Sequence, residues 1–115
     1  MSLISTYEKF TNINEEFIEF IDKLVKENFE TFSEEQIKMN LKIALNNYEK
    51  IKFESDEIPI DEENKNNLND LKYLIMSALF LVSDLKHFYE IKEYDRFKMR
   101  AINYINNSRR NKYYN

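Results

Sequence analysis

The run YLIMSALFLV, residues 73–82, is the longest apolar stretch of the chain. It is about half as long as the ~20 residues that a membrane-spanning helix needs, and Lys72 and Asp84 close it on either side. Leucine, isoleucine, alanine and valine recur every three or four positions through residues 68–85, which is the spacing of an amphipathic helix. Because the centre of this segment is apolar on nearly every side, it predicts the most buried helix of the protein, ending at about Glu90.

Three other segments show the same spacing of apolar residues. The first predicted helix covers residues 3–32, and the second covers residues 33–53. The acidic loop ESDEIPIDEE, residues 54–63, separates them from the central helix. The fourth helix covers roughly residues 95–108, and residues 109–115 form a basic tail at which the helix can fray.

Local signals mark where these helices begin and end. Ser33 and Gln36 have the spacing of a capping box, in which each side chain accepts a hydrogen bond from the backbone N–H of the other. Pro59 has no amide hydrogen and interrupts the helical pattern, while Asp61 is a favourable residue for opening the next helix. With short connections and no alternating strand pattern, the sequence predicts one all-α domain over residues 1–115. Its architecture is an antiparallel, up-down-up-down four-helix bundle with two long and two shorter helices.

The chain contains no glycine and no cysteine, and Pro59 is its only proline. Tight turns with positive φ and the loops that hold the phosphates of nucleotides depend on glycine, so we expect few of either. Without cysteine the chain has no disulfide framework and no thiolate metal site. The N-terminus has neither the basic nor the apolar region of a secretory signal, so we expect a cytoplasmic protein.

A metal centre is the first catalytic hypothesis for such a bundle, because di-iron sites are built in bundles from glutamates and two Glu-x-x-His pairs. His87 is the only histidine, and the nearest match to that pattern is Asp84-x-x-His87, which has no second copy in the chain. Nucleophilic catalysis would require this one histidine, without any glycine loop, to supply both the base and the oxyanion donors. We therefore expect no metal, no cofactor and no enzymatic activity.

All four arginines lie in the last twenty residues of a chain whose net charge is −4. Residues 96–115 carry +6, and the preceding 95 residues carry −10. Guanidinium groups pair with phosphates and tyrosine rings stack on bases. The segment is thus a candidate nucleic-acid contact made by Arg96, Lys98, Arg100, Arg109, Arg110, Lys112, Tyr113 and Tyr114. In the competing structural interpretation, the cations suit a helix C-terminus, and Arg96 and Arg100 pair with acids of the first helix or of the loop.

The predicted helix lengths also point to an interface. At 1.5 Å per residue, the first and third helices would be about 40 Å long, and the second and fourth about 30 and 25 Å or less. The shorter helices would leave one end of the bundle uncovered, and such apolar surface usually marks an interface. The apolar residues at that end are Leu3, Ile4, Tyr7, Leu68 and Leu71. In the alternative arrangement, the EIPI segment of the loop folds over them.

No motif in the sequence identifies a protein family. We expect a non-enzymatic protein that acts by binding another protein, either a second copy in a homodimer or an accessory or regulatory partner. The alternative is a nucleic-acid-associated accessory protein that binds phosphates through its basic C-terminus. The first hypothesis predicts a concentration-dependent mass, whereas the second predicts binding that weakens steeply with salt.

Overall fold

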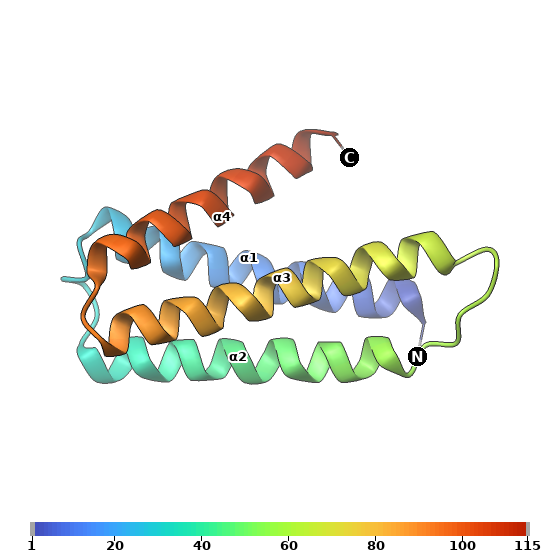
Figure 1. The fold of residues 1–115 in the computed structure, drawn as a ribbon, viewed down its shortest axis with the longest axis horizontal. Helices are drawn as coiled ribbons and strands as arrows, with labels where there is room; N and C mark the ends of the chain where they lie inside the picture. The colour runs from blue at the N-terminus through green and yellow to red at the C-terminus, as the bar shows by residue number, and fades with distance from the viewer. Residues whose placement is uncertain (1, 115) are drawn as a thin grey trace.

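Four α-helices make up the computed structural model, which describes residues 2–114 and the side chains of residues 2–109. In chain order they are α1 (Leu3–Lys26), α2 (Glu34–Asp56), α3 (Lys65–Glu90) and α4 (Tyr94–Tyr114). Successive helices run in opposite directions (Figure 1), and the described residues contain no strand. The predicted antiparallel four-helix bundle is therefore confirmed.

The apolar run at residues 73–82 lies in α3, which contributes more buried side chains to the core than α1 or α2 does. These side chains are Leu68, Leu71, Ile75, Ala78, Leu81, Val82, Leu85 and Tyr89. This agrees with the prediction of a most buried helix, although two aromatic residues of the run lie at the surface. Tyr73 and Phe80 are 73% and 59% exposed, so one face of α3 is open to solvent.

α1 ends at Lys26, several residues before the predicted end of the first helix. Asn28 and Phe29 adopt left-handed backbone conformations, with φ of 51° and 64°. Their N–H groups donate to the carbonyls of Val25 (3.3 Å) and Leu24 (2.9 Å), which is the hydrogen-bond pattern of a Schellman motif. The sequence pattern did not reveal this end, because Phe29 continues the apolar spacing of the helix.

The same motif ends α3 at the predicted Glu90, with Lys92 in the left-handed conformation (φ 61°). The N–H of Lys92 donates to the carbonyl of Tyr89 (3.2 Å), and the N–H of Glu93 donates to that of Phe88 (2.9 Å). Glycine usually occupies this position, and a side chain there costs about 1–2 kcal/mol. A chain without glycine therefore still uses positive φ at two of its helix ends.

Capping boxes precede α2 and α3. The predicted one is confirmed: Ser33 Oγ accepts from the N–H of Gln36 at 3.2 Å, and Gln36 Oε1 accepts from the N–H of Ser33 at 2.9 Å. Asp61 and Asn64 make an equivalent reciprocal pair, at 2.8 and 2.9 Å. The regular part of α3 begins at Lys65, so Asp61 opens this helix through one irregular turn.

The helices contain 24, 23, 26 and 21 residues, which corresponds to roughly 36, 35, 39 and 32 Å. α1 and α3 are the longer pair, as predicted, but the differences are smaller than expected. The main reason is that α4 continues past the predicted end at Ser108 to Tyr114. The sequence also predicted a basic tail at residues 109–115 that can fray. The side chains of residues 110–115 lie outside the described ones, so this stays a prediction.

The direction of α4 leaves part of the bundle uncovered. Near its start α4 packs against α1 and α3, and toward its C-terminus it diverges from both (Figure 1). It makes no close approach to α2. Over the N-terminal halves of α1 and α3, the bundle therefore has three packed helices rather than four.

Candidate functional site

The interface predicted at the bundle end is only partly exposed. Leu68 and Leu71 are buried, because the first turns of α3 pack into the bundle interior, and this corrects their assignment to a docking surface. Leu3 is half-buried and packs against the core. Ile4 and Tyr7 are 72% and 44% exposed, so these two residues remain available to a partner.

The loop between α2 and α3 covers this end in part. Within its EIPI segment, Ile58 is buried, whereas Pro59 and Ile60 are exposed. The alternative in which the loop folds over the bundle end therefore holds for one of its two isoleucines.

Ile4 and Tyr7 lie on the side of α1 that faces α4. Tyr7 is about two helical turns before Asn14, and Ile4 is about five turns before Asp22, so each pair shares a face of the helix. Asn14 and Asp22 both contact α4. Tyr7 and Ile4 thus continue the α4-facing side of α1 into the half that α4 does not cover.

The exposed aromatic residues of α3 continue its α4-facing side in the same way. Phe80 and Tyr73 precede Asp84 by about one and three helical turns, and Asp84 pairs with Arg100 of α4. Both rings are exposed, and toward its C-terminus α4 diverges from α3 (Figure 1). We call the surface formed by Ile4, Tyr7, Tyr73 and Phe80 the open face.

A buried polar contact fixes where α4 meets the rest of the bundle. Asn14 Oδ1 accepts two hydrogen bonds, from the Tyr48 hydroxyl of α2 at 2.9 Å and from the Tyr104 hydroxyl of α4 at 2.6 Å. Burial raises the pKa of both phenols, and that of Tyr104 reaches about 12. Both hydroxyls therefore stay protonated at neutral pH and can donate, because burial disfavours the ionised form of a phenol.

Two arginines of the basic segment attach α4 to its neighbours. Arg100 Nε lies 3.0 Å from Asp84 Oδ2 on α3, and an amino group of Arg109 lies 3.7 Å from Asp22 Oδ2 on α1. The first of these pairs is part-buried. The concentration of arginine in an acidic chain therefore has a structural consequence, which is to hold the last helix against α1 and α3.

The other two described cations also have partners within the chain. Arg96 pairs with Glu93 at 2.8 Å, and Lys98 donates to the side-chain carbonyl of Asn28 and lies over the ring of Phe29. Arg96 and Arg100 thus pair with acids other than those of the first helix or the loop, which corrects that part of the structural interpretation. The remaining predicted contacts lie outside the described side chains: Arg110, Lys112, Tyr113 and Tyr114.

The single histidine is exposed, and its ring is 6.0 Å from that of Phe88. Its candidate partner Asp84 is occupied by Arg100 instead. Within the described residues, no three histidine, aspartate or glutamate side chains are grouped so that they could hold a metal ion. The described helices also include none that is both long and apolar enough to cross a membrane.

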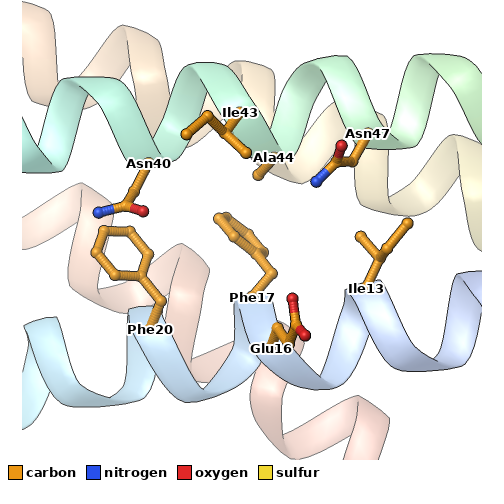
Figure 2. A pocket seen from close by; sticks show the side chains of 8 residues that line it. All are labelled: Ile13, Glu16, Phe17, Phe20, Asn40, Ile43, Ala44 and Asn47. Atoms are coloured by element: carbon orange, nitrogen blue, oxygen red, sulfur yellow. The ribbon is translucent and has the colours of Figure 1, made fainter.

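A shallow groove between α1 and α2 has a volume of about 90 Å³. Figure 2 shows Phe17 and Phe20 of α1 and Ile43 of α2 around it, with Asn40 and Glu16 at its rim. Small-molecule sites usually have volumes of about 300–1,000 Å³. The groove is therefore too small for a typical substrate or cofactor.

A second hollow, of about 170 Å³, lies between α2 and α3 and was not predicted from the sequence. Three lysines, two apolar or aromatic side chains and one acid line it: Lys38, Lys42, Lys86, Leu41, Tyr89 and Glu90. We call it the lysine hollow. No local pattern indicates this hollow, because Lys86 is more than forty residues away from the other two lysines along the chain.

The chain matches no protein-family model, no curated protein and no solved structure.

Proposed function

We propose that this chain is a non-enzymatic helical-bundle protein that acts by binding another protein through the open face. The observation that carries the proposal is the exposure of Ile4, Tyr7, Tyr73 and Phe80 along the sides of α1 and α3 that α4 leaves uncovered. Full burial of a side chain of this size stabilises a protein by about 1.5–3 kcal/mol, and that energy is available to a partner.

The composition of the open face also fits a protein partner. Tyrosine and phenylalanine are enriched where proteins bind one another, because each ring buries a large area and loses few rotamers. The two phenol groups add hydrogen-bonding capacity at the edge of the apolar surface. A partner helix laid along α1 and α3 would occupy the place of the last turns of a fully packed fourth helix.

The nucleic-acid alternative has less support. Each of its four described cations, Arg96, Lys98, Arg100 and Arg109, already contacts an acidic or amide group of the chain. Binding to phosphates would have to replace these contacts. The alternative predicts salt-sensitive binding to single-stranded nucleic acid that disappears when the chain is truncated after Asn107.

Site-specific photo-crosslinking in the cells that naturally produce the protein tests the proposal. The photoreactive residue p-benzoyl-phenylalanine replaces Tyr73 or Phe80 in separate variants, and Asn12, which is exposed on α1 outside the open face, is the control position. We expect the same discrete protein adduct from positions 73 and 80 and none from position 12. The proposal is wrong if positions 73 and 80 give no protein adduct, or if all three positions give the same adducts.

A further inference from the structure

One exposed face of α2 carries two lysines in its N-terminal half and two acids in its C-terminal half, where Lys52 pairs with Asp56 at 3.0 Å. Lys38 and Lys42 lie in the N-terminal half, and Glu49 and Asp56 lie in the C-terminal half, with Phe53 between the two acids. Their spacings of three, four or seven residues place all five on one side of the helix. We call this set the α2 stripe. Phe53 is 67% exposed, although it is a large apolar residue in the middle of the stripe.

The positive end of the α2 stripe opens onto the lysine hollow. Lys38 is 2.9 Å from Glu34, and their hydrogen bond lowers the pKa of that carboxyl. Lys42 and Lys86 have no ion pair within 4 Å among the described residues. Around the floor of Leu41 and Tyr89 the three lysines outnumber the one acid, Glu90, so this hollow favours a ligand that is both acidic and apolar.

The loop beyond the negative end of the α2 stripe has that chemistry. Residues 57–63 of this loop contain four acids and no base. Ile60 is 61% exposed within the loop, and Glu62 and Glu63 follow it closely and are exposed as well. This segment therefore presents one apolar side chain surrounded by carboxylates.

We infer that a second copy of this chain binds along the α2 stripe in the antiparallel direction, so that the acidic loop of each copy occupies the lysine hollow of the other. The hollow and the loop lie toward opposite ends of one helix, and a two-fold axis therefore brings both contacts together at once. Leu41 is in the floor of the hollow and Ile60 is the exposed apolar residue of the loop. The midpoint between them along the chain is near Lys50, so the two-fold axis passes near that residue. Phe53, less than one turn away, then becomes buried between the two α2 helices.

This surface is separate from the open face, and its occupation does not depend on the function proposed above. Tyr73→Ser therefore leaves the self-association unchanged even if it abolishes crosslinking of a partner. Conversely, a monomeric protein that still gives a partner adduct at position 73 would overturn the self-association alone.

A charge-swap experiment tests the inference by sedimentation equilibrium across protein concentration. The hollow variant is Lys42→Glu/Lys86→Glu, and the loop variant is Glu62→Lys/Glu63→Lys. The hollow variant makes the hollow acidic like the loop, and the loop variant cancels the net charge of residues 57–63, where two acids then face two lysines. In either variant alone the charges no longer complement each other, and we expect the dissociation constant to rise at least about 100-fold. In an equimolar mixture, the unaltered loop of one variant meets the unaltered hollow of the other, and the lysines at positions 62 and 63 meet the glutamates at positions 42 and 86. Heterodimers should therefore form with nearly the affinity of the unaltered chain.

Two further variants separate the contact from general effects of charge. Lys23→Glu/Lys26→Glu, on α1, changes the net charge as much as the hollow variant does and should leave the dimer intact. Phe53→Ser changes no charge and should weaken the dimer about 10-fold if the ring is buried at the axis. The inference is overturned if the unaltered chain stays monomeric to millimolar concentration, or if the mixture of folded variants does not associate.

Discussion

Replacing Asn14 by alanine removes the one acceptor that joins α1, α2 and α4. The Tyr48 hydroxyl, which is fully buried, then has no acceptor, at a cost of about 1–3 kcal/mol. Tyr104 loses the shorter of the two bonds but keeps a contact with Ser108, so its loss is closer to about 1 kcal/mol. We therefore expect Asn14→Ala to lower the free energy of unfolding by about 2–4 kcal/mol.

A double-mutant cycle distinguishes this contact from a general effect of the substitution. Tyr48→Phe removes the buried hydroxyl while Asn14 keeps its bond to Tyr104, which should cost about 1 kcal/mol. In the Tyr48→Phe background, Asn14→Ala deprives only the Tyr104 hydroxyl of its acceptor. Its cost should then be about 1–2 kcal/mol smaller than in the unaltered chain.

The assay is unfolding in urea, followed by far-ultraviolet circular dichroism, with the dependence on urea concentration compared across variants. Asn12→Ala, an exposed asparagine of the same helix, is the matched control and should change the stability by less than about 0.5 kcal/mol. The reasoning is refuted if Asn14→Ala costs no more than Asn12→Ala. It is also refuted if the two substitutions of the cycle are additive to within about 0.3 kcal/mol.

Three further predictions concern pH, a helix end and a cap. Burial raises the pKa of Tyr104 to about 12, and also raises that of Tyr48, from about 10 in the unfolded chain. Their contribution to stability is therefore complete below about pH 10 and is lost as the pH rises toward 12 and above; unfolding in urea at a series of alkaline pH values should show this fall. Lys92→Gly should stabilise the protein by about 0.5–1 kcal/mol, because glycine adopts the left-handed conformation without strain, whereas Lys50→Gly inside α2 should destabilise it by about 1 kcal/mol; thermal unfolding compares the two. Ser33→Ala should cost about 1 kcal/mol in the same assay, since it removes the acceptor for the N–H of Gln36.

Much of the fold could be predicted because its signals are local. The spacing of apolar residues within each segment identified all four helices, and the pairing of Ser33 with Gln36 marked the start of α2. The end of α1, where a left-handed turn is made without glycine at Asn28, was predicted less well. Such a turn depends on backbone hydrogen bonds and leaves no distinctive residue in the sequence.

The candidate site was predicted only in part. Ile4 and Tyr7 were expected to be exposed, and they are, but Leu68 and Leu71 were assigned to the same surface and are buried. The spacing of apolar residues along a helix shows which of them share a face. Whether that face is exposed depends on which neighbouring helix covers it. Phe80 was missed for this reason, since it belongs to the apolar run of α3 and is nevertheless 59% exposed.

By itself, the sequence determined the number, order and approximate length of the helices and the identity of the most buried one, because these follow from contacts within three or four residues along the chain. Only the tertiary structure decided the direction of α4, and with it the open face. That direction depends on Asn14, which meets Tyr48 and Tyr104 from 34 and 90 residues away. The lysine hollow likewise exists only because α2 and α3 place distant lysines together. Partners this far apart are selected by packing and by the burial of polar groups, which no local pattern records.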